Sequence, residues 1–190
     1  MNSLEQEKIH ARQIIINGGN PFIRGSEELA DDYEFALEAV DIDGYLISYL
    51  SERLKSDEKI ALTAINSCSE AFDFLDCELK YDKEFIMEAI EVDPGIFEFC
   101  EDFHDDKEFI MEAIEIDEDP LFLLEFISAK LLDDKKIIEA CIKKNADALD
   151  YASNRLKKDR FFNNFKNVKR EFIKFYSDGS KRFNSILLSF

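Results

Sequence analysis

"DKEFIMEAI", residues 82–90, returns without a single change at residues 106–114. Looser copies are "DYEFALEAV" from Asp32, "DEKIALTAI" from Asp57 and "DKKIIEACI" from Asp134, and the start of a sixth copy lies at Asp159. The steps between the six aspartates are 25, 25, 24, 28 and 25 residues. Self-similarity at a nearly fixed period of this size is typical of repeat proteins.

Positions counted from each aspartate show what the copies share. Positions +3, +4, +7 and +8 are apolar or small in every complete copy, which is the spacing of one buried face of an α-helix. The aspartate itself stands where a helix N-cap is expected, with its carboxylate able to accept the first free amides. Position +7 is always small, which indicates a close helix–helix approach; it holds Ala39, Ala64, Ala89, Ala113 and Cys141.

A second apolar pattern precedes each aspartate, at positions −3, −7 and −10. Spacings of three, four and seven again predict a short helix with one buried face. Polar breaks such as "DIDG" at 41–44 and "VDPG" at 92–95 separate the two patterns. The sequence therefore predicts a pair of short antiparallel helices in each unit.

Helices of about ten residues are marginal in water by themselves, so the units must stack to bury their apolar faces. We predict an all-α protein, an α-solenoid of tandem short helix–turn–helix repeats of about 25 residues with atypical terminal capping helices. The 28-residue step indicates an insertion, which we expect as a longer turn or helix extension near residues 117–123.

The domain organisation follows from where the pattern fades. We expect one helical-repeat domain over residues 1–190, with an N-terminal cap and half repeat at 1–31 and about five repeats at 32–158. Residues 2–16 should be helical, and residues 159–190 should form a basic, Phe-rich C-terminal cap. In that cap we expect one amphipathic helix ending near Gly179, followed by the apolar segment "NSILLSF"; its apolar side would hold Phe161, Phe162, Phe165, Val168, Phe172 and Phe175.

Composition limits the environment of the protein. No stretch approaches 18 uncharged apolar residues, so no transmembrane helix is predicted, and the N-terminus lacks the apolar region of a signal peptide. The four cysteines have no CxxC or zinc-like spacing, which favours buried free thiols in a reducing compartment; they are Cys68, Cys77, Cys100 and Cys141. We therefore expect a cytoplasmic protein without membrane contact.

No catalytic signature is present. The common phosphate, dinucleotide, hydrolase and zinc-protease motifs are all absent, and Ser67 and Cys68 have no histidine nearby in sequence to activate them. Glu101-x-x-His104 has half of a di-iron spacing, and we expect a surface helix end there instead. "DIDG" and "DEDP" lack the rest of a calcium loop. The sequence thus predicts no enzyme, no cofactor and no metal site.

Charge is divided unevenly along the chain. Residues 1–133 hold 10 Lys and Arg against 35 Asp and Glu, a net −25, whereas residues 134–190 hold 14 against 7, a net +7. Such an acidic field repels nucleic acid and attracts basic partners. We expect another protein with a basic surface to bind the most acidic block, at Glu91, Asp93, Glu98, Glu101, Asp102, Asp105, Glu112, Glu115, Asp117, Glu118 and Asp119.

The repeats resemble a known family. "DKEFIMEAIEVDPGIFEFCEDFHDD" and "DKKIIEACIKKNADALDYASNRLKKD" are similar to the repeats of the family called domain of unknown function 4116, and Ala148–Leu156 is the closest stretch. The central copies depart from the family's Ala-Ser pair, with Leu75-Asp76 and Phe99-Cys100 instead. The resemblance implies a helical repeat and supplies no catalytic residues.

Two hypotheses for function remain open. The first is a non-catalytic helical repeat scaffold that binds a protein through its acidic surface. The alternative is an acidic nucleic-acid mimic, a decoy that inhibits a nucleic-acid-binding enzyme such as a host defence nuclease. Direct nucleic-acid binding by the basic C-terminal stretch, and self-association through the charge split, are weaker alternatives.

Overall fold

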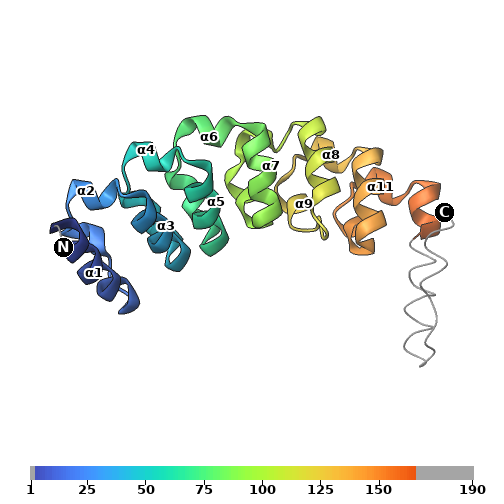
Figure 1. Cartoon of the computed structure of the whole chain (residues 1–190). Coiled ribbons are helices and arrows are strands. Elements are labelled where there is room, and N and C mark those ends of the chain that lie inside the picture. The colour runs from blue at the N-terminus through green and yellow to red at the C-terminus, as the bar shows by residue number, and fades with distance from the viewer. Residues whose placement is uncertain (1–2, 166–190) are drawn as a thin grey trace, which may run out of the picture.

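The computed structural model describes residues 3–165, and every regular element in them is helical. Similar units follow one another from α1 at the N-terminal end to the orange helix at the other end, as Figure 1 shows. Each unit packs on the next one in the chain, so the units form a gently arched row. The predicted all-helical architecture is confirmed.

A ten-residue α-helix follows each repeat aspartate: α3 Tyr33–Ile42, α5 Glu58–Ser67, α7 Lys83–Val92, α8 Lys107–Ile116 and α11 Lys135–Lys144. The aspartate is the N-cap in all five, and its carboxylate accepts from the amide three residues later. Examples are Asp32 to Phe35 N at 2.9 Å and Asp82 to Phe85 N at 3.1 Å. This cap satisfies an amide that the helix itself cannot bond, so the predicted N-cap role is confirmed.

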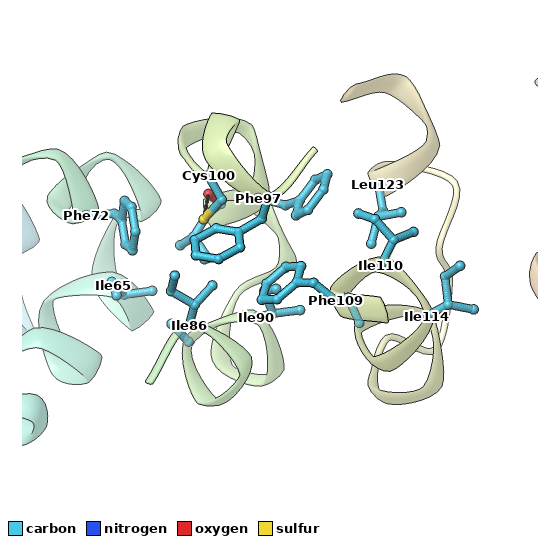
Figure 2. Close-up of a cluster of buried hydrophobic side chains, with 14 of the residues drawn as sticks. Ile65, Phe72, Ile86, Ile90, Phe97, Cys100, Phe109, Ile110, Ile114 and Leu123 are labelled. Atoms are coloured by element: carbon cyan, nitrogen blue, oxygen red, sulfur yellow. Dashed lines mark hydrogen bonds between the residues drawn. The ribbon is translucent and has the colours of Figure 1, made fainter. Parts of the chain in front are cut away.

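The predicted apolar columns form the core. All residues at +3, +4, +7 and +8 of the five long helices are buried, and the small residues at +7 have no exposed surface. α3, α5, α7, α8 and α11 pack side by side along the chain through these faces. Figure 2 shows the middle of this core, where Ile86, Ile90 and Phe109 from long helices point toward Phe72 and Phe97 of the opposite layer.

The second half of each unit differs from the prediction. The single helix expected there is two shorter pieces, a 3-10 helix followed by about one α-helical turn. The 3-10 helices are η2 Gly44–Tyr49, η3 Ser69–Phe74, η4 Pro94–Phe99 and η6 Ala146–Asp150. The short α-helices are α4 Glu52–Lys55, α6 Cys77–Tyr81, α10 Ala129–Leu132 and α12 Asn154–Lys157.

An additional cap explains this break. Six residues before the repeat aspartate stands Ser51, Asp76, Ser128 or Ser153, each with extended backbone and a side chain that accepts from an amide of the short helix. Such residues compete with helix continuation and start a new helix instead. Eleven positions after the aspartate, Asp43, Asp93 and Asn145 cap their 3-10 helices in the same way, as Asp43 does for Tyr45 N at 3.1 Å; Cys68, at this position before η3, makes no side-chain cap bond.

One unit lacks the additional cap. The step from Asp82 to Asp106 is one residue short, so Cys100 both ends η4 and precedes the next turn, and it makes no side-chain cap bond. The following element is the 3-10 helix η5 Glu101–Phe103, not a short α-helix. Counting back from Asp106 placed Phe99 in the buried column, and this was wrong: Phe99 is half-buried, whereas Cys100 is buried.

The 28-residue step contains the predicted longer turn. α8 ends at Ile116, residues 117–122 form a turn, and α9 Leu123–Phe126 takes the place of a 3-10 helix. Its buried Leu123 and Leu124 occupy the core side of the second layer.

Charged side chains link successive units. The lysine after one aspartate reaches the next aspartate in Lys83–Asp106 at 2.5 Å, Lys107–Asp134 and Lys135–Asp159 at 3.9 Å. Lys8 of α1 Ser3–Ile16 binds Asp32 in the same manner at 2.5 Å. Glu7 and Lys8 lie 25 residues before Asp32 and Tyr33, so α1 is a divergent copy of the long helix.

The N-terminal end agrees with the prediction, whereas the start of the C-terminal cap agrees only in part. After α1, η1 Pro21–Ile23 and α2 Glu27–Ala30 repeat the second half of a unit. Asp159 starts a last helix, in which Phe162 is buried but Phe161 is 46% exposed, so Phe161 is not on the apolar side. The remaining expectations for this cap, at Val168, Phe172, Phe175, Gly179 and the last apolar segment, lie outside the described residues.

Gly44 lies at a close approach between two units. A Cβ added there would lie 2.3 Å from Ala64 O, and the Gly44 amide donates to Ser67 Oγ at 3.1 Å. Gly95, in the equivalent turn two units on, would meet only side-chain atoms, the nearest being Asp93 Oδ1 at 2.9 Å.

We predict that Gly44→Ala lowers the free energy of unfolding by about 1–3 kcal/mol, because the Ala64 backbone cannot move without shifting α5. Gly95→Ala should cost less, because a side chain can rotate away. Urea unfolding followed by circular dichroism measures both variants. Equal losses would show that Gly44 is not a site of close packing.

Candidate functional site

The acidic residues predicted to form one binding site are spread over several surfaces. Nine of the eleven are exposed, Asp93 is half-buried and Asp117 is 8% exposed. Glu91, Glu112 and Glu115 lie on α7 and α8, while Glu98, Glu101 and Asp102 lie on η4 and η5. Glu118 and Asp119 belong to the turn after α8. The prediction of a single contiguous block is therefore not supported by their placement.

Three of these residues have structural roles. The Asp93 carboxylate accepts from Gly95 N at 2.8 Å and caps η4, whereas that of Asp117 accepts from Asp119 N at 2.9 Å within the turn that follows α8. Asp105 accepts from the Ser128 hydroxyl of the next unit. Their charges serve the fold, because capping residues are held by the amides they satisfy.

A contiguous acidic surface does exist on the outer side of α7 and α8. Positions +2, +6 and +9 lie opposite the buried stripe of each long helix. In α7 and α8 all six of these positions are exposed glutamates, which we call the glutamate face: Glu84, Glu88, Glu91, Glu108, Glu112 and Glu115. Since α7 packs beside α8, the six side chains form two neighbouring rows.

Three of the six face residues, Glu84, Glu88 and Glu108, are not among the predicted binding residues. Glu84 and Glu88 precede the acidic block, and Glu108 lies within it. The signal was available in the helix period, because the residues at +2, +6 and +9 share one side of a helix.

The glutamate face has little positive charge to balance it. The nearest lysines in sequence, Lys83 and Lys107, are bound to Asp106 and Asp134 of the following units. The hydrogen bond to Asp106 raises the pKa of Lys83, and the negative charges of Glu108 and Glu112 raise it further. The adjacent α5 holds Lys59, Thr63 and Asn66 at the same three positions, so the acidic character ends there.

On the other side of the glutamate face, two of the outward positions of α11 carry positive charge in place of negative charge. Its residues at +2 and +9 are exposed Lys136 and Lys143, with Ala140 between them. Apolar side chains border the glutamate face, with Met87 and Met111 half-buried and Val92 and Ile116 exposed by 40% and 37%. A surface that combines carboxylates with exposed apolar side chains suits a protein partner.

The histidine side chain that could bind a metal or transfer a proton already has partners within the fold. His104 Nε2 donates to Phe97 O at 2.8 Å, and its ring lies 4.6 Å from that of Phe97 and 5.8 Å from that of Phe126. His104 is the C-cap of η5 and Glu101 is exposed, as expected for a surface helix end, but the His104 ring itself is half-buried and packed. Among residues 3–165 no three His, Cys, Asp or Glu side chains converge as metal ligands.

The four cysteines are free thiols in two kinds of environment. Burial raises the pKa of both Cys100 and Cys141 to about 12, so these thiols remain protonated. Cys77 is exposed and Cys68 half-buried, so the expectation that all four are buried is wrong for these two. In residues 3–165 no helix has both the length and the apolar character needed to cross a membrane.

Comparison with known proteins identifies a family for which no activity is known. The model of the family described as a domain of unknown function (DUF4116) matches five overlapping stretches, at residues 14–55, 32–80, 57–103, 82–132 and 106–157. Each match spans about two of the units described above. No curated protein and no solved structure matches the chain.

We predict that the bonds between units make the fold sensitive to acid. Ser153 and Arg155 lower the pKa of Asp133, and Lys83 lowers that of Asp106. A lowered folded-state pKa contributes stability that is present above the unfolded value of about 3.9 and is lost as the pH falls through the folded value. The double variant Asp106→Asn/Asp133→Asn should therefore be less stable than the wild type near neutral pH.

This difference in the free energy of unfolding should shrink as the pH falls from about 5 to about 2, because the wild-type carboxylates then lose their charge too. Urea titrations of both proteins across this range test it. Asparagine still caps helices, so capping is matched in the two proteins. A difference that stays constant down to the lowest pH would contradict a role of the two charges.

Proposed function

Because the chain belongs to the DUF4116 family, which carries no known activity, we propose its function from geometry: a non-catalytic helical-repeat scaffold that binds a basic protein surface through the glutamate face. We further infer that the whole array is an α-solenoid with a repeat of about 25 residues. The recurrence of one capped long helix and one 3-10 segment in successive units supports this inference.

The observation that carries the proposal is the charge of the glutamate face, whose six carboxylates form no ion pair within residues 3–165. Six exposed glutamates occupy every outward position at +2, +6 and +9 of two adjacent helices, and none of them caps a helix or forms an ion pair within residues 3–165. Like charges on neighbouring helices destabilise the fold slightly, so stability does not explain their presence. A basic partner would relieve this repulsion and be steered toward the face.

Non-catalytic binding also fits the chemistry of the described residues. His104 is held by a backbone carbonyl, and the buried thiols of Cys100 and Cys141 are kept protonated. A nucleophile needs an adjacent base or a lowered pKa, and neither condition is met at these groups. We accordingly place function in surface recognition, in a protein that we expect in the cytoplasm.

The second candidate function is inhibition of a nucleic-acid-binding enzyme by mimicry. The two parallel rows of carboxylates favour it, because regularly spaced negative charges can occupy a groove built for phosphates. Both candidates use the same face and a basic protein, and they differ in whether nucleic acid competes for that partner.

We predict that a variant with all six face glutamates changed to glutamine loses its partner. The tagged wild-type and variant proteins would be used for pull-downs from a lysate of the source organism at low and high salt, with quantitative mass spectrometry. We expect one partner enriched at low salt by the wild type and depleted at least about tenfold in the variant, because several exposed charge pairs are lost together.

The control removes six acidic charges from other surfaces, at Glu34, Asp41, Glu58, Glu78, Glu118 and Asp150, each changed to its amide. This control should retain the partner, since net charge is then matched. Retention by the glutamate-face variant, or equal loss in both variants, would refute the placement of the site. Release of the partner by its own nucleic acid would establish the decoy function over the scaffold.

A further inference from the structure

A second surface lies on the 3-10 layer of the protein, opposite the long helices. At the end of each 3-10 helix, or of α9, an aromatic residue follows a polar one, which is acidic in four of five units. The pairs are Ser48-Tyr49, Asp73-Phe74, Glu98-Phe99, Glu125-Phe126 and Asp150-Tyr151. We call the five aromatic residues the aromatic row. Tyr49 is 49% and Phe74 37% exposed, and the other three are half-buried.

Two hollows open beside this row, where one unit meets the next. The first is lined by Tyr49, Leu50 and Ser51 together with Glu27, Glu28, Ala30 and Asp31 of the preceding unit. The second is lined by Phe99, Cys100, Glu101, Asp102 and Phe103 together with Phe72, Asp73, Lys80 and Tyr81 of the preceding unit. Tyr49 and Phe99 are 50 residues apart, as are Asp31 and Tyr81, so the hollows are equivalent places two units apart.

Each hollow is lined by an aromatic side chain and by carboxylates that have no hydrogen-bond or ion-pair partner within residues 3–165. In the first, Asp31 is held by Ser51 and Arg53, while the side chains of Glu27 and Glu28 form no hydrogen bond or ion pair within residues 3–165. In the second, the side chains of Glu101 and Asp102 likewise form no hydrogen bond or ion pair within residues 3–165. The one base there, Lys80, is bound to the Asp73 carbonyl oxygen. Both hollows are therefore negative. The exposed ring is Tyr49 in the first hollow and Tyr81, 63% exposed, in the second, where Phe99 is half-buried.

A flat cation that also donates several hydrogen bonds suits this combination best. The arginine guanidinium stacks on aromatic faces and donates two parallel bonds to a carboxylate, whereas a lysine ammonium is a compact, strongly hydrated charge. Phosphates and other anions are repelled. The partner chemistry is thus that of an arginine side chain.

We propose that the two hollows hold two arginine side chains of one extended peptide segment of a partner protein, laid along the aromatic row. Packed helices lie about 8–10 Å apart, so two units span about 20 Å. An extended chain advances about 3.3 Å per residue, which places the two arginines about six residues apart. This site is distinct from the glutamate face and goes beyond the function proposed for it.

The test is a titration of the isotope-labelled protein with a synthetic twelve-residue peptide, followed by NMR. The peptide carries arginine at its third and ninth positions and Gly, Ser and Thr elsewhere. We expect amide shifts at residues 27–31, 49–51, 72–81 and 99–103. Tyr49→Leu/Phe99→Leu should weaken binding about tenfold, because each ring loses its attraction for a cation.

Three controls separate this site from general charge attraction. Phe161→Leu removes an exposed ring outside the hollows and the aromatic row and should bind like the wild type. A peptide with arginines only three positions apart should bind several-fold more weakly, because it cannot reach both hollows. The variant with six glutamines on the glutamate face should still bind, so failure of either proposal is seen separately.

The proposal is overturned if the leucine variant at Tyr49 and Phe99 binds as well as the wild type, or if arginine spacing makes no difference. Shifts confined to the glutamate face would also overturn it. If replacing Phe99 unfolds the protein, the variant Glu27→Gln/Glu28→Gln/Glu101→Gln/Asp102→Asn takes its place, and unchanged affinity in that variant is equally decisive.

Discussion

The capping of each long helix by the aspartate at its start is the interaction on which the rest of the structure depends. Its carboxylate accepts an amide of its own helix, and in Asp32, Asp106 and Asp134 it also binds a lysine of the preceding unit. A ten-residue helix is marginal alone, so it needs both a cap and a neighbour. One side chain supplies both, which couples the folding of each helix to the packing of the next.

Because one aspartate provides both the cap and the contact to its neighbour, many other positions in each unit have no role in the fold. The core uses +3, +4, +7 and +8, and the caps use at most three polar positions per unit, so the outward residues at +2, +6 and +9 can change without affecting packing. They are acidic in α3, mixed in α5, acidic in α7 and α8, and basic or small in α11. The surface of a repeat protein can therefore acquire a binding site unit by unit while the helices remain the same.

The unit between Asp82 and Asp106 keeps the fold although it departs from the common repeat pattern. Between Asp82 and Asp106 one residue is missing, the serine-type cap is replaced by the buried Cys100, and a 3-10 turn replaces the short α-helix. A compensating bond remains: Lys80, His104 and Lys157 each donate to the carbonyl seven residues earlier. His104 thus takes the place of a lysine, and the irregular junction is where the second of the two hollows lies.

The amino-acid sequence alone determined the helical units, their N-caps, the buried columns and the longer turn after α8, because these depend on spacing along one helix. It did not reveal that the second half of each unit divides at Ser51, Asp76, Ser128 and Ser153, since apolar spacings of three and four fit a continuous helix equally well. Only the tertiary structure decided which acids share a surface. It separated Glu91 from Glu101 and placed Glu91 of α7 on the same face as Glu115 of α8, because neighbours in a stack of helices are residues one unit apart and not residues adjacent in the chain.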